Sequence, residues 1–446
     1  MYVKTQVFLV LGVSKSGYAV AKHILSNGGK CYLFEEMSNP KIDGAISELI
    51  GLGAIKLQKD NLEEVVSKID CLVISPGVPI NHYVAVMAKN FNKRIIGELE
   101  YGVLQFIPPI IAVTGTNGKT TTVTLIDSIL NHAGEKSLLV GNVGIPLTSK
   151  IDDADSDSIC VAEVSSFQLE SIFSFCPHIA CVLNISPDHL ERHYSMENYI
   201  YLKKRIFKNQ RESEYLILNY DDQVVREFKE QSRAKNLFVS TKEKVDGCYI
   251  LDEKIYYFDK FVMDIEDLSL KGMHNVYNSL FAICVSKIMG VANEDIIYAL
   301  KNFKGVRHRM EIIAQKYGVT FYNDSKATNT GSTLSAIAQM TAPTILILGG
   351  SEKGESYQNL FEKIKSSPIK HVILTGASRF NMLKSAGEVG YSNLTVTPDF
   401  ETAVKITKLI ALDGDAVLLS PACASFDTFN GYEERGDTFK KIVENF

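Results

Sequence analysis

The chain has 446 residues, a formal net charge of −5 and a pI near 6.0. A chain of this length should form two to four domains, because single domains usually hold roughly 100 to 200 residues. The slight acidity, with no long run of lysine or arginine, argues against a nucleic acid or an anionic membrane as a partner. Small molecules or proteins are the expected partners.

The N-terminal run MYVKTQVFLVLGV shares one feature with a signal peptide, a lysine before apolar residues. The run is short, no small-residue cleavage site follows, and Gly12 opens a turn as after a first strand. No other segment approaches the ~18 apolar residues of a membrane helix. The eight cysteines form no CxxC pair, so reduced thiols are expected rather than disulfides or zinc. We therefore expect a soluble, cytoplasmic protein.

Short apolar runs that end in Gly, Ser, Asn, Asp or Pro recur along the chain and are typical of strands buried on both faces of a sheet. In chain order they are 6–12, 71–77, 110–115, 137–142, 159–165, 179–186, 215–221, 344–350, 371–376 and 416–421. Segments with helical periodicity separate them, which predicts α/β domains with parallel sheets. The mixed, charged region 232–270 predicts no clear element.

Composition and motif spacing indicate three domains, 1–97, 98–305 and 306–446. The first opens with Gly12-x-Ser14-x-x-Gly17 after a strand. Because Ser14 replaces the middle glycine of the dinucleotide fingerprint, an NAD site is doubtful there, while another nucleotide or a nucleotide sugar stays open.

Residues 111–124, IAVTGTNGKTTTVT, place glycines, a lysine and threonines between a strand and a helical segment. The backbone N–H groups of 115–120 and the positive end of the helix would suit a polyphosphate. Lys119 could reach the β- and γ-phosphates, and the Thr120 hydroxyl is placed for Mg²⁺. The first glycine of the common phosphate loop is absent, since Val113 stands there. A chance glycine turn is the alternative, but the ordered combination favours a phosphate loop.

Two further residues lie at predicted strand ends. Glu163 ends one apolar run, and His189 follows the next run along the chain. Each alone is more often a solvated or structural residue. Because both are expected at the sheet edge that carries Lys119, the pair indicates hard metal ligands beside the phosphate loop.

Two polar segments follow apolar runs in the third domain, YNDSKATN (322–329) and SPACASFD (420–427). Asn, Asp and Ser often only cap loops, and each segment alone favours that explanation. Their common position after strands also suits the wall of a binding pocket.

Together these motifs resemble the Mur ligases, most closely the branch that adds D-glutamate to the peptidoglycan precursor. The resemblance covers nearly the whole chain and runs through Gly115–Thr121, GNVG (141–144), EVSSFQLE (163–170), Asp188-His189, His274-Asn275, His308-Arg309, NDSKATN (323–329), GGSEKG (349–354), SPACASFDTF (420–429) and YEERG (432–436). A phosphate loop without its first glycine is the form of this superfamily, which includes folylpolyglutamate synthase. NDSKATN together with SPACASFD is more specific to the D-glutamate branch.

The resemblance implies a three-domain α/β enzyme. A Rossmann-like domain, 1–97, would bind UDP-N-acetylmuramoyl-L-alanine, and a central P-loop ATPase-type domain, 98–305, would bind ATP. A Rossmann-like domain, 306–446, would bring D-glutamate. The implied reaction is ATP-dependent amide ligation through an acyl phosphate, with two Mg²⁺ ions as cofactors. We expect a monomer without nucleic-acid or membrane partners.

The resemblance also assigns residues, one position at a time. It implies nucleotide contacts at Gly115, Thr116, Asn117, Gly118, Lys119, Thr120, Thr121, Asn275, Asn278, Arg309 and Asp324. Substrate contacts would be Ser16, Glu35, Gly77, Asn142 and His189 for the UDP substrate, and Thr328, Lys353, Ser425 and Tyr432 for D-glutamate. Tyr432 stands where phenylalanine is also found.

The implied catalytic residues are Lys119, Glu163, His189, Lys203 and Lys326. Thr120, Glu163, His189 and a carbamylated Lys203 would form the metal site. The neighbouring Lys204 leaves the carbamylated position open by one residue. Carbamylation requires a neutral amine, so the site should depress the pKa of this lysine.

Other ligases of the superfamily are the nearest alternatives: a sister Mur ligase or a folylpolyglutamate synthase-like enzyme. The segment DNPR, expected of the diaminopimelate-adding type, is absent. A nucleotide-binding regulator without catalysis is a further alternative. Such a protein should have lost Lys119, Glu163, His189 or Lys326, and all four are present.

Overall fold

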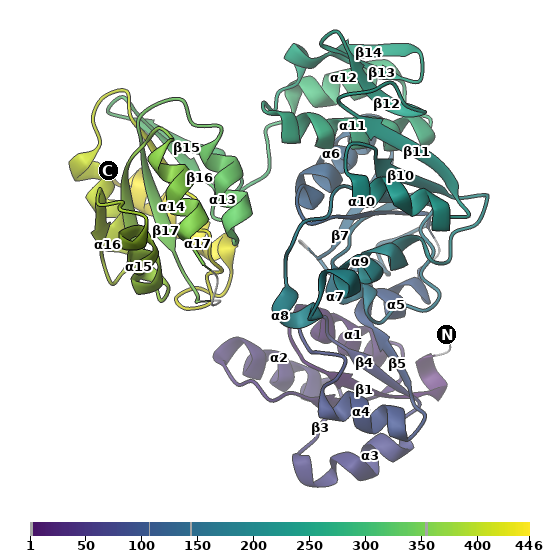
Figure 1. Cartoon of the computed structure of the whole chain (residues 1–446). Coiled ribbons are helices and arrows are strands. Elements are labelled where there is room, and N and C mark those ends of the chain that lie inside the picture. Colours follow the sequence, from purple (N-terminus) through teal and green to yellow (C-terminus); the bar gives the residue numbers. More distant parts are fainter. Residues whose placement is uncertain (1–2, 107, 143–144, 353–355) are drawn as a thin grey trace. The chain divides into compact units, whose positions relative to one another are not determined.

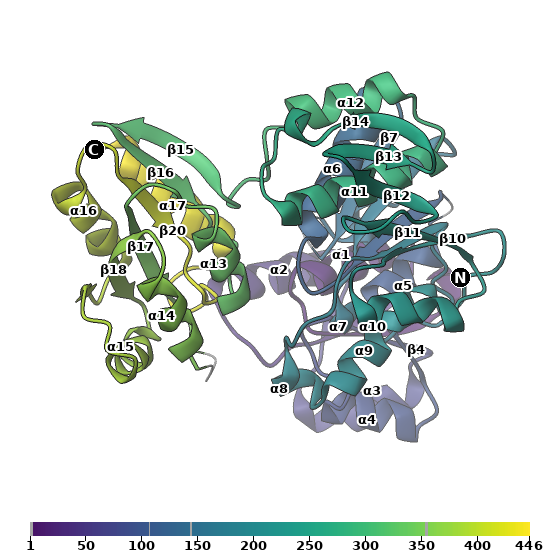
Figure 2. The same cartoon turned by 45° about the horizontal axis from the view of Figure 1, so that its top comes forward.

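The computed structural model describes residues 3–106, 108–142, 145–352 and 356–446 (Figures 1 and 2). The chain divides into two compact units, Met1–Phe303 and Lys304–Phe446. The described residues form a five-stranded, a nine-stranded and a six-stranded sheet, which lie within 1–97, 98–305 and 306–446 respectively. The first two sheets belong to the first unit and the third belongs to the second.

The first sheet is parallel, in the order β3-β2-β1-β4-β5. Its strands are β1 (Val7–Leu11), β2 (Lys30–Phe34), β3 (Ile55–Lys56), β4 (Cys71–Ile74) and β5 (Arg94–Gly97), with helices α1 (Lys15–Ser26), α2 (Pro40–Gly51), α3 (Leu62–Lys68) and α4 (Tyr83–Asn90). Two separate apolar clusters involve the strands, so both faces are covered. The strand order reverses between β1 and β4, which is where open α/β sheets bind ligands.

The second sheet has the order β14-β13-β12-β11-β10-β9-β6-β8-β7. Its strands are β6 (Ile110–Thr114), β7 (Lys136–Gly141), β8 (Ser158–Glu163), β9 (Ile179–Val182), β10 (Tyr215–Asn219), β11 (Lys235–Ser240), β12 (Gly247–Leu251), β13 (Lys254–Tyr257) and β14 (Lys260–Asp264). The pairing is parallel from β7 to β12 and antiparallel for β12-β13 and β13-β14. The region 232–270, where no element was predicted, thus extends the sheet.

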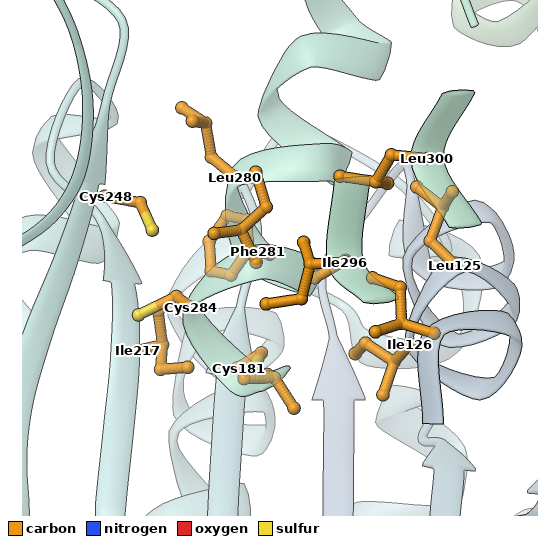
Figure 3. Close-up of a cluster of buried hydrophobic side chains, with 14 of the residues drawn as sticks. Leu125, Ile126, Cys181, Ile217, Cys248, Leu280, Phe281, Cys284, Ile296 and Leu300 are labelled. Carbon is orange, nitrogen blue, oxygen red and sulfur yellow. The ribbon is translucent and has the colours of Figure 1, made fainter. Parts of the chain in front are cut away.

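Helices cover both faces of this second sheet. They are α6 (Lys119–His132), α7 (Ser166–Leu169), α8 (Leu190–His193), α9 (Met196–Lys204), α10 (Gln223–Arg226), α11 (Met273–Ile288) and α12 (Asn293–Asn302). Helix α5 (Glu98–Val103) instead packs against β4 and β5 of the first sheet. Figure 3 shows the larger core, where Phe281 and Cys284 of α11 lie with Ile126 of α6 and Ile217 of β10. This packing fixes α6, whose first residue is Lys119, against the sheet.

Two buried carboxylates join the first sheet to the second. Glu98, in α5, accepts hydrogen bonds from the Thr148 N–H and hydroxyl at 2.8 and 2.9 Å. Glu100 accepts from the backbone N–H groups of 173–175 at 2.8, 2.8 and 3.1 Å. Both side chains are buried. The connection at 97–98 is therefore a packed junction, which explains why both sheets fall in one compact unit.

The third sheet has the order β15-β16-β20-β17-β18-β19. Its strands are β15 (Glu311–Lys316), β16 (Val319–Asn323), β17 (Thr344–Gly349), β18 (Ile369–Thr375), β19 (Leu394–Val396) and β20 (Ala416–Leu419), with helices α13 (Thr330–Ile337), α14 (Gln358–Lys365), α15 (Arg379–Glu388), α16 (Phe400–Ile410) and α17 (Tyr432–Glu444). β15 pairs antiparallel with β16, and the other pairings are parallel.

The α/β class is confirmed, and each of the ten predicted apolar runs overlaps a strand. The predicted parallel sheets carry antiparallel strands at two edges, which the sequence did not indicate. There the hairpins β12–β14 and β15–β16 add antiparallel strands, which short turns can connect without a crossover helix. All eight cysteines are free, and all but Cys176 are buried. Among the described residues, no helix combines the length and the hydropathy needed to cross a bilayer.

Candidate active site

The phosphate loop lies between β6 and α6 and depends on two glycines with positive φ. Gly115 has φ 155° and Gly118 has φ 88°. A β-carbon on Gly118 would lie 2.5 Å from Oδ1 of Asn278, and one on Gly115 would lie 2.9 Å from Cβ of Leu183. Both positions therefore require glycine for backbone conformation and for space.

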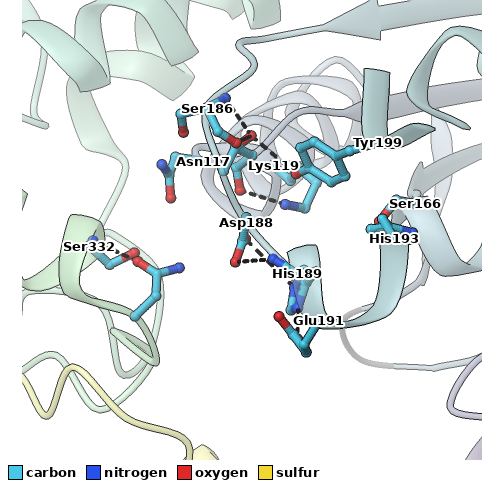
Figure 4. A network of polar contacts seen from close by, with 12 residues as sticks. Asn117, Lys119, Ser166, Ser186, Asp188, His189, Glu191, His193, Tyr199 and Ser332 are labelled. Atoms are coloured by element: carbon cyan, nitrogen blue, oxygen red, sulfur yellow. Dashed lines mark hydrogen bonds and ion pairs between the residues drawn. The ribbon is translucent and has the colours of Figure 1, made fainter. Parts of the chain in front are cut away.

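Asn184, which follows β9, holds this loop in place. Its Oδ1 accepts from the Asn117 N–H at 2.9 Å, and its Nδ2 donates to the Asn117 carbonyl at 3.0 Å. The Thr116 N–H donates to the Asn184 carbonyl at 3.0 Å. The Thr116 hydroxyl lies 3.1 Å from the Tyr199 hydroxyl, and the Ser186 N–H donates to it at 3.0 Å (Figure 4). The loop is thus anchored from two sides.

Lys119 turns back over its own loop. Its ammonium donates to the carbonyls of Gly115 and Thr116, both at 2.8 Å, and Figure 4 shows it between Asn117 and Tyr199. Thr120 and Thr121, which follow it in the first turn of α6, are buried. The ammonium therefore lies where the backbone of the loop and the start of a helix combine, which is the arrangement of an anion-binding site.

Glu163 ends β8 beside the phosphate loop, because β8 pairs with β6. The Thr120 hydroxyl donates to Oε2 of Glu163 at 2.6 Å, and Nδ2 of Asn142 donates to Oε1 at 2.8 Å. Glu163 is only 2% exposed. A carboxylate and a hydroxyl this close supply the hard oxygen atoms that Mg²⁺ prefers.

Lys203, in α9, is almost fully buried against the same loop. Its Nζ donates to the Gly115 carbonyl at 2.8 Å and lies 4.7 Å from the Tyr199 ring centroid. Burial and the nearby Lys119 ammonium hold the pKa of Lys203 well below its ordinary range. Lys204 instead lies over the Phe228 ring. Of the two lysines, Lys203 contacts the phosphate loop and has the environment that favours a neutral amine.

His189 lies at the start of α8 with positive φ, 53°. Its Nε2 is 3.6 Å from Oδ2 of Asp188, and its Nδ1 is 3.5 Å from Oε1 of Glu191 (Figure 4). The centroids of the His189 and Phe167 rings are 4.9 Å apart. None of its contacts within the described residues joins it to Glu163. Among those residues, no cluster of three or more His, Cys, Asp and Glu side chains forms a metal site.

Asn275 and Asn278 lie in the first turns of α11, which packs against α6. Nδ2 of Asn278 donates to Oδ1 of Asn275 at 3.3 Å, and the Thr122 hydroxyl donates to Oδ1 of Asn278 at 3.2 Å. The packing of α11 on α6 therefore brings two side-chain amides beside Gly118.

Three of the five residues assigned to the UDP substrate, Ser16, Glu35 and Gly77, lie at the carboxyl edge of the first sheet. Ser16 is in the first turn of α1, and Glu35 follows β2 and accepts from the Val13 N–H at 2.7 Å. Gly77 follows β4 in a loop whose Ser75 hydroxyl donates to the Gly12 carbonyl at 2.7 Å. Asn142 is separate from this edge, since its side chain binds Glu163.

In the second unit, Asp324 lies buried after β16. Its Oδ1 accepts from the Met310 N–H at 3.2 Å, and its Oδ2 accepts from the Ser420 hydroxyl at 2.7 Å. Burial raises the pKa of Asp324 to about 6, although Arg309 lowers it in part. The segment 323–326 and the segment that begins at Ser420 thus form one edge of the third sheet.

Lys326 and Tyr432 lie together at this edge. The Lys326 ammonium donates to the Tyr432 hydroxyl at 3.3 Å and lies 5.0 Å from the centroid of its ring. The Thr328 N–H donates to the Lys326 carbonyl at 2.9 Å, and Ser425 is buried. Lys353 lies outside the described residues.

Four residues of the central domain near the phosphate loop and α8 had no predicted role: Asn184, Tyr199, Glu170 and Arg192. Asn184 directly precedes the segment 185–189, and Glu170 ends the motif that begins with Glu163, so their positions were visible in the sequence. Their contacts were not, because each binds a residue distant in the chain. Only folding reveals that Tyr199 contacts Thr116.

Comparison with known proteins identifies the family. The Mur ligase middle domain matches residues 113–286, and the Mur ligase glutamate ligase domain matches 308–423. Proteins named UDP-N-acetylmuramoylalanine--D-glutamate ligase from Lachnospira eligens and Clostridioides difficile are each 38% identical to the chain, with full coverage of both. The one from Koribacter versatilis is 40% identical over 99% of this chain and 98% of its own.

Solved structures share the fold. UDP-N-acetylmuramate-alanine ligase MurC from Thermotoga maritima has a TM-score of 0.65 at 17% identity and covers 99% of both chains. MurF ligase from T. maritima in complex with ADP has a TM-score of 0.60 at 16% identity and covers 100% of this chain and 99% of its own. The chain belongs to the Mur ligase family.

Proposed function

We propose that this ligase uses ATP to join D-glutamate to UDP-N-acetylmuramoyl-L-alanine in peptidoglycan precursor synthesis. The observation that carries the proposal is the convergence of Lys119, Thr120, Glu163 and Lys203 at one sheet edge. The chain also aligns over its full length with relatives named for this activity. A carboxylate is a poor acyl donor, so ATP would first convert the L-alanyl carboxylate to an acyl phosphate.

The phosphate loop would hold the nucleotide. The N–H groups of Thr116 and Asn117 bind Asn184, so the other backbone N–H groups of 115–120 and the start of α6 would hold the phosphates. Asn275 and Asn278 would contact the nucleoside. Lys119 would leave its loop carbonyls to offset charge on the transferring phosphoryl group. We assign Lys326, Arg309 and Asp324 of the second unit to the same nucleotide, on the basis of the resemblance.

A magnesium site fits the polar atoms beside this loop. The Thr120 hydroxyl and Glu163 carboxylate, in contact at 2.6 Å, and His189 would hold Mg²⁺. When bound, the ion neutralises charge on phosphate oxygens. Asn142 holds one carboxylate oxygen of Glu163 and so orients the other towards Thr120.

Carbamylation of Lys203 is supported by its environment. The amine is buried, its pKa is depressed by that burial and by Lys119, and it contacts the phosphate loop. A neutral amine adds to CO₂ to form a carbamate and releases one proton. Lys203→Ala should be inactive and partly rescued by a short-chain carboxylate. Absence of rescue, or intact-mass data without a CO₂ adduct, would refute this part of the proposal.

The second unit would bring D-glutamate. Thr328, Ser425, Tyr432 and Lys353 are the proposed contacts, so that the amine can attack the acyl phosphate to form the amide and release phosphate. No covalent protein intermediate is required, and positioning would supply most of the acceleration. Lys353→Ala should raise KM for D-glutamate more than KM for ATP. Equal increases would remove Lys353 from this pocket.

The testing experiment measures phosphate release from ATP and Mg²⁺ with UDP-N-acetylmuramoyl-L-alanine. D-Glutamate is compared with L-glutamate, L-alanine and no amino acid. We expect turnover only with D-glutamate, and none in Lys119→Ala, whose circular dichroism should match that of the parent. Turnover with another amino acid would move the chain to a sister specificity. Turnover by Lys119→Ala would refute the role of this lysine.

A further inference from the structure

The loop that follows β4 is bound by Arg192, a side chain from the central domain of the same compact unit. Nη2 of Arg192 donates to the carbonyls of Val78 at 3.1 Å and Pro76 at 3.5 Å, and Nη1 donates to the Gly77 carbonyl at 3.4 Å. Arg192 belongs to α8, three residues after His189. One side chain therefore links the proposed UDP-substrate loop to the segment that carries a proposed metal residue.

The Arg192 guanidinium is held in position by Glu170 and the Phe167 ring. Its Nε donates to Oε1 of Glu170 at 3.2 Å, and its Nη2 donates to Oε2 at 2.7 Å, while the Phe167 ring centroid lies 4.9 Å away. The side chains of Arg192 and Glu170 are only 15% and 11% exposed. Such two-point pairing of Arg with a carboxylate fixes orientation, which a lysine cannot reproduce.

The backbone at Glu170 is held in place by Arg205 of the same domain. The Arg205 guanidinium donates to the Glu170 carbonyl at 2.8 Å and to the Ile172 carbonyl at 2.6 Å. Glu170 also ends the segment that begins at Glu163, so the support for Arg192 comes from the chain that leaves the proposed metal site. The loop, Arg192 and Glu170 therefore form one hydrogen-bonded connection.

His193 gives the cluster a superficial likeness to a catalytic triad. Its Nε2 lies 2.9 Å from the Ser166 hydroxyl, and its Nδ1 lies 3.6 Å from Oε1 of Glu170. Glu170 is already paired with Arg192, and Ser166 is buried. Burial also lowers the pKa of His193 to about 4, so this imidazole is neutral at pH 7 and leaves Arg192 as the cation paired with Glu170. The arrangement supports positioning rather than nucleophilic chemistry.

A second contact joins the same two segments. Nδ2 of Asn81 donates to the hydroxyl of Tyr194 at 3.3 Å, directly after α8. Tyr194 has a positive φ of 64°, which turns the chain immediately after His193. The segment 189–194 therefore contacts both ends of the loop 76–81. Arg192 binds the carbonyls of 76–78, and Tyr194 binds Asn81.

We propose that Arg192 is a positioning residue that fixes the loop 76–78 relative to the segment 188–193. By fixing this loop, Arg192 would determine how the UDP group of the substrate binds while the L-alanyl carboxylate of the same substrate reaches the nucleotide site. Binding energy from a remote part of a substrate can be used in this way to orient its reacting group. The inference rests on the proposed function, because the loop matters through the UDP substrate.

The test uses Arg192→Met, Arg192→Lys and Glu170→Gln in the full chain. The control is Arg226→Met, at an arginine of α10 that lies 4.9 Å from the centroid of the Tyr220 ring. Calorimetry measures the Kd of UDP-N-acetylmuramoyl-L-alanine and of UDP alone, and kinetics give KM for each of the three substrates. For Arg192→Met, we expect the muramoyl Kd and KM to rise about tenfold, from loss of charge-assisted hydrogen bonds. KM for ATP and for D-glutamate should change less than twofold.

The other variants separate positioning from stability. Arg192→Lys should show an intermediate Kd, because it keeps the charge without the fork. Arg192→Met combined with Glu170→Gln should resemble Arg192→Met alone, since Glu170 acts through Arg192. Arg226→Met should leave the muramoyl Kd unchanged.

Two outcomes overturn the inference: an unchanged muramoyl Kd in Arg192→Met, or equal KM increases for all three substrates. Hydrogen exchange of the peptide 75–82 gives an independent readout and should become faster in Arg192→Met but not in Arg226→Met. Absence of turnover in the parent protein would refute the proposed ligase reaction instead. UDP binding and hydrogen exchange would still decide whether Arg192 fixes the loop.

Discussion

Replacement of Asp324 by Asn should change how the stability of the second unit depends on pH. Burial raises the pKa of Asp324 to about 6, against an ordinary value of 3.8. Asn is nearly isosteric, can accept from the Met310 N–H and can donate to the Ser420 hydroxyl. The substitution therefore removes the titration and retains the two contacts that the carboxyl group makes.

The direction in which the stability of the second unit changes with pH follows from proton binding by Asp324. Between about pH 4 and pH 6 the folded state keeps the Asp324 proton, while the unfolded state has released it. The stability that this proton contributes is complete below the unfolded pKa and is lost as pH rises through the folded pKa. A rise in pKa of roughly two corresponds to about 3 kcal/mol, at roughly 1.4 kcal/mol per pKa unit.

Hydrogen exchange of peptides from β17 and β20 measures the opening free energy of the second unit in the full chain. Between pH 4 and pH 7 the free energy of the parent, relative to that of Asp324→Asn, should fall by up to about 3 kcal/mol. The first unit, measured on β6 and β9, serves as the internal control and should show no difference between the proteins. Parallel pH profiles for the second unit would refute a raised Asp324 pKa.

Three further substitutions test the fold and the pocket. Gly17→Ala would place a β-carbon 1.9 Å from the Gly12 carbonyl oxygen, so thermal unfolding should show a loss of about 1–3 kcal/mol. Glu100→Gln removes a charged acceptor from three backbone N–H groups and should cost about 2 kcal/mol by the same assay. Tyr432→Phe loses the hydroxyl that accepts from Lys326, and kcat/KM should fall about fivefold.

Each of these has a contrary outcome. An unchanged melting temperature in Gly17→Ala would mean that the loop after β1 can move away from α1. An unfolding curve of Glu100→Gln identical to that of the parent would remove Glu100 from the junction between the first two sheets. For Tyr432→Phe, unaltered kinetics would show that the ring alone supports Lys326.

The strands were predictable where they are short and buried on both faces. Runs such as IIAVTG and TILILGG are apolar throughout and end at glycine, and β6 and β17 lie there. The strands β11 to β14 were not recognised, because their burial is mixed and their pairing changes from parallel to antiparallel. A sheet edge of this kind gives no periodic pattern in the sequence.

The candidate site was predictable where its residues are contiguous. The phosphate loop is local, so glycines, lysine and threonine in order indicated both its conformation and its place before a helix. Asn142 shows where prediction from a local motif stops. Its motif indicated a substrate contact, whereas its side chain binds Glu163, a strand neighbour whose register no local pattern specifies. Its contact with substrate stays a prediction.

The sequence by itself determined the α/β class, the loop that begins at Gly115 and the membership of the Mur ligase family, because these depend on local order and composition. The tertiary structure decided which distant side chains meet. It buried Lys203 against the Gly115 carbonyl, and it tied the first sheet to the second through Glu98, Glu100 and Arg192. The physical reason is that a pKa, a buried ion pair or a packed junction depends on neighbours that only folding supplies.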